Sequence, residues 1–435
     1  MSGLQLFRAA IFHTRANPFR DADALRMYED GGLLVRDGRI VASGAFADVR
    51  KADSAGDATL IDWRGGMVLP GFVDTHVHYP QLRIVGRLGR TLLDWLEQAA
   101  LPEEQRMAEA AYATDTAARF VAALAAHGTT TALVFGAHFA AATSSLFEAA
   151  AGKGLRIISG LVVSDRFVPE PLRQPVNGAY RDSIELIRRY HGRGRLLYAV
   201  TPRFALSASD EMLEMCASLL SEHKDVRVQS HVNEDRGEIE KVAAAFPAAR
   251  NYVDVYDRAG LTGRRTVLAH NVHATDAELE CLAATGTVIA HCPTSNAALG
   301  SGIFPFRRHL DAGVRVALGT DVGGGTGLGM LEEGLQAYLL QRVAADGVML
   351  DAAQLLYLST LAGAEALGLD AEIGSLCVGK AADFVYLRPP VGSLLEAVLQ
   401  RASGPEDMLS ALFTLGGEES VREVRVAGSV VHQVS

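Results

Sequence analysis

Residues 71–81 of the chain read GFVDTHVHYPQ, and this stretch decides how the rest of the sequence is interpreted. An apolar run over residues 67–73 leads into two histidines, His76 and His78, that are separated by one residue. If the run is a β-strand, both imidazoles point to the same face, because side chains alternate along a strand. Such a pair can supply half of a metal site, or it can be two unrelated histidines of the core or the surface.

Three later apolar runs also end on a polar residue that can bind a metal or carry a proton. The runs cover residues 226–230, 266–269 and 314–318, and the polar residues that follow them are His231, His270 and Asp321. A (β/α)₈ barrel places its active site at the carboxyl ends of its strands, so four strands with such ends predict this fold. Histidines scattered through a core would not fall repeatedly at strand ends.

The sequence resembles the amidohydrolase superfamily in the run PGFVDTHVH (residues 70–78). It also resembles it in His231, His270 and Asp321, which follow in that order. Further motifs are similar to those of the superfamily members that deaminate guanine. They are YPQ (79–81), TPRF (201–204), HVNE (231–234), HCPTSN (291–296) and GTDVGG (319–324). The resemblance covers nearly the whole chain.

The composition is that of a globular protein. With 435 residues, 49% of them hydrophobic and 21% charged, the chain is long enough for a large domain and an accessory one. The formal net charge of -10 argues against nucleic acid as a partner, because binding phosphates requires a basic surface. The four cysteines form no C-x-x-C pair, no secretory signal is recognisable, and no apolar stretch reaches the roughly 20 residues of a membrane span. We therefore expect a cytoplasmic protein.

Predicted strands and helices alternate over residues 67–370, which indicates a parallel sheet. The first strand is expected at residues 67–78. The helical region after it covers residues 92–100 and 103–126 and ends at Gly128, a residue suited to the position just past a helix. Residues 1–66 and 371–435 read as short strands and turns that lack the apolar surface to fold alone. We expect an α/β protein, a (β/α)₈ TIM-type barrel with a small β-sandwich domain formed by both termini, as in superfamily relatives.

Two segments stand apart from this alternation. Residues 79–102 contain Trp95, and the resemblance implies a long loop over the mouth of the site. Residues 322–330 read VGGGTGLGM, which suggests a phosphate-binding loop, but the Lys-Ser/Thr of that motif is missing. We interpret this run as a permissive loop after the eighth strand.

Four residues are, by the resemblance, the ligands of one metal ion: His76, His78, His231 and Asp321. Three imidazoles and one carboxylate suit Zn²⁺, with water completing the coordination, although iron would accept the same ligands. In two-metal amidohydrolases, a carboxylated lysine on the fourth strand bridges the ions. The corresponding residues 197–204 read LYAVTPRF and contain no lysine, so we expect one metal ion and disfavour dihydropyrimidinase-type chemistry.

Three residues are candidates for catalysis: Glu234, His270 and Asp321. Glu234 lies three residues beyond His231, where a carboxylate can take a proton from water and deliver it to a ring nitrogen and then to the leaving amine. Considered alone, Glu234 reads as a surface residue that opens a helix, and the resemblance favours the catalytic role. His270 is expected to hold the water, and Asp321 can act as both ligand and base.

Gln81, Arg203 and Phe204 are expected to select the substrate, and they are the residues that point to guanine. An amide offers a donor and an acceptor to a purine edge, a guanidinium suits a carbonyl such as O6, and a phenyl ring can stack on the base. Each has an ordinary alternative: Gln81 as a loop residue, Arg203 as a surface charge and Phe204 as part of the core.

The pair His291–Cys292 could be a cysteine nucleophile with its base, but adjacent strand residues face opposite ways. We interpret the pair as a structural motif of the seventh strand, with a contact between His291 and substrate as an alternative that rests on analogy.

The sequence therefore predicts a zinc-dependent hydrolase that converts guanine to xanthine and ammonia in purine catabolism. 8-Oxoguanine or a triazine is an alternative substrate, because the pocket signature is short. An amidohydrolase-like interaction protein without catalysis is the alternative of another class, although such chains typically lack the ligands that this one keeps. The resemblance also implies a homodimer.

Overall fold

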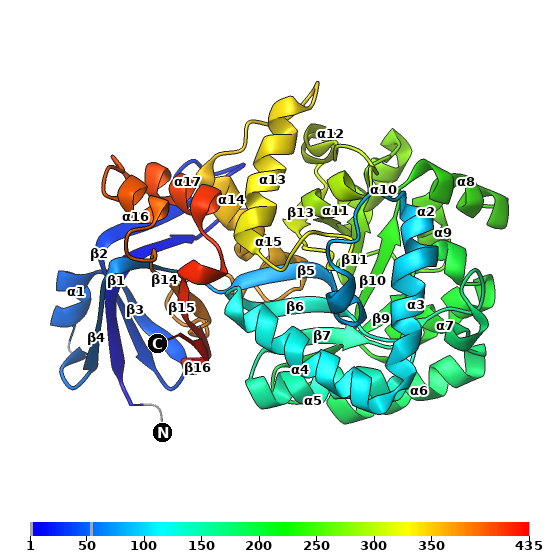
Figure 1. Cartoon of the computed structure of the whole chain (residues 1–435), viewed down its shortest axis with the longest axis horizontal. Coiled ribbons are helices and arrows are strands. Elements are labelled where there is room, and N and C mark those ends of the chain that lie inside the picture. Colours follow the sequence, from blue (N-terminus) through cyan, green and yellow to red (C-terminus); the bar gives the residue numbers. More distant parts are fainter. Residues whose placement is uncertain (1–2, 53–54, 435) are drawn as a thin grey trace.

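Eight parallel strands of the computed structural model form a nearly closed barrel, and helices surround it (Figure 1). The structure describes residues 3–52 and 55–434. In order around the barrel, its strands are β5 (Phe72–His78), β6 (Thr129–Phe135), β7 (Arg156–Gly160), β9 (Leu196–Pro202), β10 (Arg227–Val232), β11 (Thr266–His270), β12 (Val288–His291) and β13 (Arg315–Leu318). The short strand β8 (Val162–Val163) pairs with β9 beside this path. The predicted (β/α)₈ barrel is confirmed.

The barrel closes between its first strand and the segment that follows its last one. The backbone N–H of Asp321 donates to the carbonyl of His76 (2.8 Å), and that of His78 donates to the carbonyl of Val322 (2.9 Å). Gly319 permits this approach, because a Cβ at that position would lie only 2.8 Å from the Cβ of His76. Closure therefore brings His76 and His78 of the first barrel strand close to Asp321, which follows the last one.

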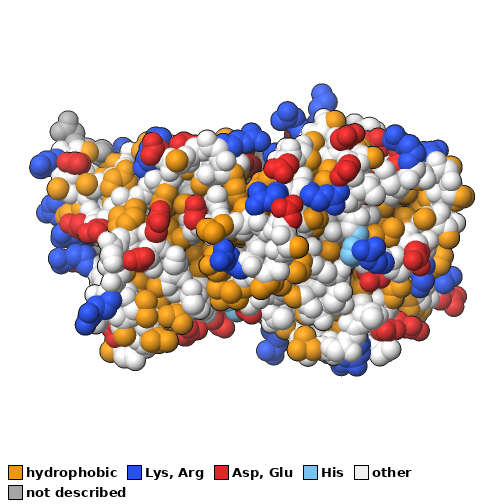
Figure 2. Space-filling model, turned by 90° about the horizontal axis from the view of Figure 1, so that it is seen from above, with side chains coloured by type: hydrophobic (Ala, Val, Ile, Leu, Met, Phe, Trp, Pro, Cys, Tyr) orange, Lys and Arg blue, Asp and Glu red, His pale blue; other side chains and the backbone are white. Residues whose placement is uncertain are grey.

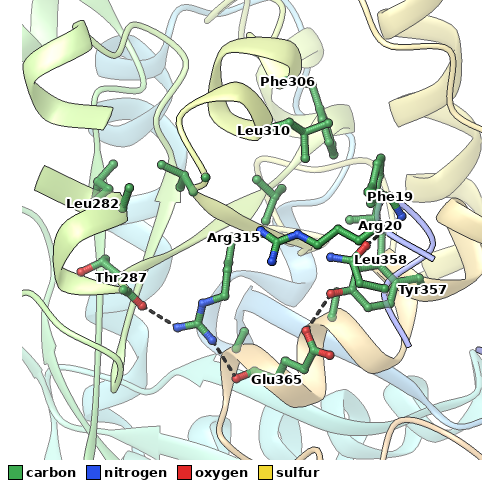
Figure 3. A pocket seen from close by; sticks show the side chains of 18 of the residues that line it. Phe19, Arg20, Leu282, Thr287, Phe306, Leu310, Arg315, Tyr357, Leu358 and Glu365 are labelled. Carbon is green, nitrogen blue, oxygen red and sulfur yellow. Dashed lines mark hydrogen bonds between the residues drawn. The ribbon is translucent and has the colours of Figure 1, made fainter. Parts of the chain in front are cut away.

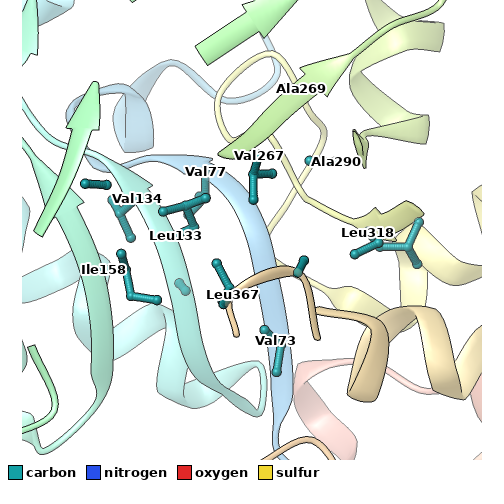
Figure 4. Packing of buried hydrophobic residues seen from close by; sticks show 14 of the residues in the cluster. Val73, Val77, Leu133, Val134, Ile158, Val267, Ala269, Ala290, Leu318 and Leu367 are labelled. Atoms are coloured by element: carbon teal, nitrogen blue, oxygen red, sulfur yellow. The ribbon is translucent and has the colours of Figure 1, made fainter. Parts of the chain in front are cut away.

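Branched and small apolar side chains of the barrel strands pack in one buried cluster (Figure 4). Val73 and Leu133 come from neighbouring strands and are fully buried. Leu367, which follows α15 (Leu361–Ala366), belongs to the same cluster. Gly363 lets α15 lie against β5, since a Cβ there would be 2.7 Å from Val73 Cγ1. Helix α15 thus packs near the amino end of β5, away from the end that carries the histidines.

The helices that follow the barrel strands pack outside them. They are α4 (Ala110–Ala126), α5 (Ala140–Lys153), α6 (Val176–Tyr190), α7 (Asp210–Glu222), α8 (Arg236–Ala245), α9 (Tyr252–Arg258), α10 (Asp276–Thr285), α11 (Pro293–Ala298), α12 (Phe306–Asp311), α13 (Met330–Val343) and α14 (Ala352–Ser359). Helix α4 ends as predicted, because Gly128 has a left-handed φ of 82° just past it. Thr275 and Glu278 form a capping box that starts α10.

Both ends of the chain form one mixed sheet of seven strands beside the barrel, as the sequence predicted. From edge to edge its strands are β16 (Ser429–Gln433), β15 (Val421–Val426), β14 (Phe384–Leu387), β4 (Thr59–Pro70), β1 (Gln5–Thr14), β2 (Leu25–Arg36) and β3 (Arg39–Ala45). The turn between β2 and β3 has positive φ at Asp37 (50°) and Gly38 (77°). Trp63 stacks on Tyr386 at 4.3 Å, which joins the two ends of the chain. The two terminal segments also contain the helices α1 (Phe46–Lys51), α16 (Leu394–Leu399) and α17 (Pro405–Leu415).

The structure corrects the predicted start of the first barrel strand. That strand begins at Phe72 instead of residue 67. Residues 67–70 belong to β4, because they pair antiparallel with Phe384–Leu387 of β14. The apolar run was continuous in sequence, but its first part is held by the small sheet.

Residues 79–102, expected as a long loop over the mouth of the site, contain the helical stretch that was predicted at residues 92–100. The segment forms a 3₁₀ turn (Tyr79–Ile84), α2 (Leu92–Trp95), a π-helical turn (Leu96–Ala100) and the start of α3 (Leu101–Gln105). The reason is the helical spacing of its buried side chains, which places one apolar face on the core. These side chains are Leu92, Trp95, Leu96, Ala99 and Ala100.

Charged side chains of both signs are interspersed on the face of the molecule that Figure 2 shows, alongside apolar ones. Within residues 3–52 and 55–434, we found no helix with the length and apolarity that a bilayer crossing requires.

Candidate active site

Four predicted residues converge at the carboxyl ends of the barrel strands. Nε2 of His78 lies 3.3 Å from Nε2 of His76 and 3.1 Å from Nε2 of His231. Oδ1 of Asp321 lies 3.1 Å from Nε2 of His76 and 3.3 Å from that of His78. A tetrahedral zinc site with bonds of about 2.0–2.1 Å has ligand atoms roughly 3.3 Å apart. These four separations therefore match the spacing of ligand atoms around one zinc ion.

The protonation of the histidines also fits a metal ion. Burial is the main reason that the pKa of His76 is lowered to about 3, so its ring is neutral and has a free lone pair. The pKa of His231 is well below its usual value for the same reason. Nδ1 of His231 donates to the carbonyl of Arg203 (2.5 Å), which leaves Nε2 as the nitrogen that faces the other ligands.

His270 lies beside this set and contacts both candidate carboxylates. Its Nε2 is 3.3 Å from Oε2 of Glu234 and 3.8 Å from Oδ2 of Asp321. Its Nδ1 lies 2.9 Å from the amide oxygen of Asn296, whereas Nε2 makes no hydrogen bond within the described residues. With His76, His231 and Asp321, His270 places one ligand atom each within 4.8 Å of the others. The free Nε2 therefore points at the space where an attacking water would be placed.

Glu234 and Asp321 are buried carboxyl groups whose pKa values move in opposite directions. Burial, followed by the charge of Asp321, raises the pKa of Glu234 well above its usual value. Burial also acts to raise the pKa of Asp321, but His76 and His78 outweigh it and hold that pKa well below the usual value. Two carboxyls separated in this way can serve as a proton carrier and a permanently charged ligand.

The residues at the strand ends adopt strained backbone conformations. Positive φ angles occur at Asn233 (48°), His270 (74°), Asn271 (51°) and Asp321 (48°). A left-handed conformation costs a non-glycine residue roughly 1–2 kcal/mol, and such residues concentrate at functional sites. The strain here aims His270 and Asp321 toward the common centre.

The three residues predicted to select substrate line one small cavity with Glu234 and Asp321. The cavity measures about 20 Å³, which is room for about one water molecule. Its apolar lining is Leu92, Trp95, Leu96, Phe204 and Leu299. The helical stretch at residues 92–96 therefore forms one wall of the site.

Gln81 and Arg203 are both held by a residue that was not predicted, Glu104. Nη2 of Arg203 donates to Oε1 of Glu104 (3.0 Å), and Nε2 of Gln81 donates to the same oxygen (2.8 Å). The backbone N–H of Gly323 donates to Oε1 of Gln81 (3.1 Å). His138 lies with its Nδ1 3.4 Å from Oε2 of Glu104. The buried carboxylate thus fixes both candidate substrate-binding side chains.

Comparison with known protein families supports the interpretation of these residues. The amidohydrolase family matches residues 67–431, a range that contains the whole barrel and every candidate site residue. The chain belongs to the amidohydrolase family. Several relatives and structural neighbours of this amidohydrolase are guanine deaminases by name.

A probable guanine deaminase of Deinococcus radiodurans is 54% identical to this amidohydrolase over 432 residues, which cover 98% of each chain. The solved structure of Escherichia coli guanine deaminase matches with a TM-score of 0.94 and 38% identity, covering 100% of both chains. Guanine deaminase from C. acetobutylicum, solved with guanine bound in its active site, matches with a TM-score of 0.91 and 26% identity. That match covers 99% of this chain and 100% of the other.

Asp74 is a second residue of this amidohydrolase that the sequence analysis did not single out. It is fully buried and accepts hydrogen bonds from Oγ1 of Thr320 (2.5 Å) and from the backbone N–H of His76 (3.1 Å). Burial raises its pKa to about 7. The sequence could have indicated a role for Asp74, because it is a carboxylate at the end of an apolar run, two residues before a candidate ligand. It links β5 to the segment that carries Asp321.

His291 and Cys292 do not line the cavity. The ring of His291 stacks on Phe304 with centroids 4.3 Å apart, and neither ring nitrogen has a hydrogen-bond partner within the described residues. Burial raises the pKa of Cys292 well above its usual value. A thiol in this state is a poor nucleophile, and the geometry favours the structural interpretation of the pair.

Proposed function

We propose that this amidohydrolase is a guanine deaminase that hydrolyses guanine to xanthine and ammonia with one zinc ion per chain. The observation that carries the proposal is that three of the four candidate ligands, the candidate proton carrier and the candidate guanine-reading side chains line one cavity. Full-length similarity to guanine deaminases supports the choice of substrate.

His76, His78, His231 and Asp321 would hold the metal ion, and zinc suits these ligands best, although iron also accepts them. When bound, such an ion lowers the pKa of a coordinated water from 15.7 to about 7 and so makes it a nucleophile at neutral pH. Nε2 of His270 is free to accept a hydrogen bond from that water and orient it toward C2 of the purine.

Glu234 carries protons between the water and the substrate. Burial raises its pKa well above the usual value, so its carboxylate is a stronger base than an ordinary one, which suits a group that must both accept and release a proton. It takes a proton from the attacking water and passes it to a ring nitrogen of guanine. A second proton, from the hydroxyl group that the water has added at C2, then reaches the amino group. The bond between C2 and that nitrogen breaks, and ammonia leaves while the carbonyl of xanthine forms.

Arg203 and Gln81 read the purine edge, and Phe204 packs against its ring. A guanidinium has five N–H donors, so Arg203 can keep its bonds to Glu104 and still donate to O6 of guanine. Glu104 is the positioning residue of this pair, because it neutralises the buried guanidinium and holds the amide of Gln81.

The test is ammonia release from guanine, 8-oxoguanine, a triazine, cytosine and adenine, together with metal analysis of the same preparation. We expect one ion per chain and turnover of guanine above the other compounds. Faster turnover of 8-oxoguanine or the triazine would move the assignment to another aminohydrolase. Metal-loaded protein without activity on any of them would instead favour an interaction protein.

We further propose a homodimer that acts in the cytoplasm in purine catabolism, with both termini as one structural unit and the barrel as the other. The boundary predicted between residues 66 and 67 moves to residue 70, because residues 67–70 belong to β4 of the small sheet. Relatives in the superfamily motivate these points. Sedimentation of the purified chain tests the dimer, and a species with the mass of one chain at assay concentration would contradict it.

A further inference from the structure

A second and much larger cavity lies at the amino ends of the barrel strands, away from the candidate active site (Figure 3). Its volume is about 690 Å³, within the range of roughly 300–1,000 Å³ that ligand pockets have. Residues 17–20 of the small sheet's β1–β2 connection form one wall, and the starts of β12 and β13 form another. Cavities between two structural units are frequent ligand sites.

Three arginines from different parts of the chain line this cavity: Arg20, Arg264 and Arg315. Arg20 extends from its loop across the cavity toward the strand that carries Arg315 (Figure 3). A Cβ built on Gly286 would lie 3.1 Å from Cγ of Arg264 and 3.9 Å from Nη2 of Arg315, so these two side chains approach the same point. Three positive groups therefore gather around one space.

Among the described residues, none of these arginines has a carboxylate within 4.0 Å. Arg315 donates to the backbone carbonyls of Gly286 (2.5 Å) and Glu365 (3.5 Å), which carry no charge. The cavity also has two acidic side chains, Asp311 and Glu365, and Oε2 of Glu365 accepts a hydrogen bond from Tyr357 (2.7 Å). The positive charges outnumber the negative ones and are left without ion-pair partners.

Aromatic rings form the remaining wall. Phe19 and Phe306 stack with centroids 5.9 Å apart, and Tyr357 meets Phe19 edge-on at 6.3 Å. A cavity with cationic groups beside flat apolar rings matches a ligand that has an anionic group and a planar part. Guanidinium forks pair especially well with phosphate, because two parallel N–H bonds fit two of its oxygens.

We propose that this cavity binds a small organic phosphate with a planar ring, of the size of a nucleoside monophosphate. The phosphate lies among Arg20, Arg264 and Arg315, and the ring lies against Phe19 and Tyr357. Binding at this site is independent of guanine turnover, because the cavity shares no lining residue with the candidate active site.

The test is titration calorimetry of the full, metal-loaded chain with adenosine 5′-monophosphate at low salt. Ribose 5-phosphate and inorganic phosphate are titrated in parallel, which separates the contribution of the ring from that of the phosphate. We expect the nucleotide to bind most tightly, and Arg20→Ala and Arg264→Ala each to weaken it at least about tenfold, as loss of a charged hydrogen bond does. Unchanged guanine turnover in both variants shows that they are folded.

Arg189→Ala is the matched control, because it removes the same charge from an exposed arginine that pairs with Glu148 on the outside of the barrel. Its affinity for the nucleotide should equal that of the wild type. The proposal would be overturned if nucleotide at up to about 1 mM released no heat of binding, because a Kd above that value means very weak binding. So would equal losses in all three variants, or nucleotide binding no tighter than that of inorganic phosphate.

Discussion

Glu234 and Asp321 lie in the same buried site, yet their surroundings assign them different tasks. Asp321 is surrounded by imidazoles that favour its charged form. Glu234 faces that negative charge from a buried position, which favours its neutral form. The position of each carboxyl relative to the histidines therefore decides which one holds a metal and which one moves a proton.

Replacing Glu234 by Gln should leave metal content unchanged and reduce kcat by roughly 10²–10⁴-fold, because the amide has the same shape but cannot carry a proton. Metal analysis and steady-state kinetics on guanine check this. Glu240→Gln, on the exposed face of α8, is the control and should match the wild type. Turnover of Glu234→Gln within a few-fold of the wild type would remove Glu234 from the mechanism.

Arg203→Ala should lower kcat/KM for guanine at least about tenfold with full metal content, because a buried carbonyl that loses its donor costs about 1–3 kcal/mol. Wild type should reject adenine, which carries an amine where guanine has O6. Glu104→Gln should act in the same direction through Arg203 and mainly raise KM, while the exposed Glu109→Gln should not. Wild-type guanine kinetics in a fully metallated Arg203→Ala protein would place substrate selection elsewhere.

The candidate ligands were predictable from sequence because each follows an apolar run, and strand ends converge in a barrel. Glu104 was not predictable in this way. It stands next to Glu103 in one helix, and nothing local distinguishes the two carboxylates. The structure shows that Glu103 pairs with Tyr112 and Arg106, whereas Glu104 faces Arg203. Its role depends on contacts between residues about a hundred positions apart.

At the scale of helices and strands, periodicity predicted the type of each element better than its limits. Helix α4 ended where glycine permits a left-handed turn. The predicted start of the first barrel strand was wrong because the apolar run of residues 67–73 continues from one strand into the next, and only pairing with β14 separates them. Hydrogen bonds to a strand more than three hundred residues later leave no local mark.

Two glycines in helices should respond to alanine with opposite signs. Gly363→Ala places a methyl 2.7 Å from Val73 and should destabilise the fold by about 1–3 kcal/mol, because α15 must move away from β5. Gly152→Ala in α5 meets no atom within 4 Å and should stabilise it by about 0.5–1 kcal/mol through helix propensity. Urea unfolding of both variants measures the shifts. Equal shifts of the same sign would mean that α15 is not held as tightly as the geometry indicates.

On the scale of the whole molecule, buried histidines make the fold sensitive to acid. Burial lowers the pKa of His13 on β1 from 6.5 to about 4, far from the candidate active site. Between these values the unfolded chain binds a proton that the folded chain does not, so stability is complete above pH 6.5 and is lost as the pH falls toward 4.

His13 alone should account for about 2 kcal/mol of stability lost between pH 7 and pH 5. Replacing it by Gln removes the titrating group, so the loss over this interval should be smaller by that amount in the variant. Urea unfolding of both proteins at the two pH values measures the difference. An identical loss in wild type and variant would show that His13 is protonated equally in the folded and unfolded chains.

The order of strands in the small sheet has a consequence for the growing chain on the ribosome. β4 pairs on one side with β1 and on the other with β14, which is synthesised only after the whole barrel. Until residues 384–387 emerge, one edge of β4 offers unpaired N–H and C=O groups to any other strand. A chain that is cut short between the barrel and β14 therefore carries an open edge beside a finished barrel, and is the species of this protein most prone to aggregate.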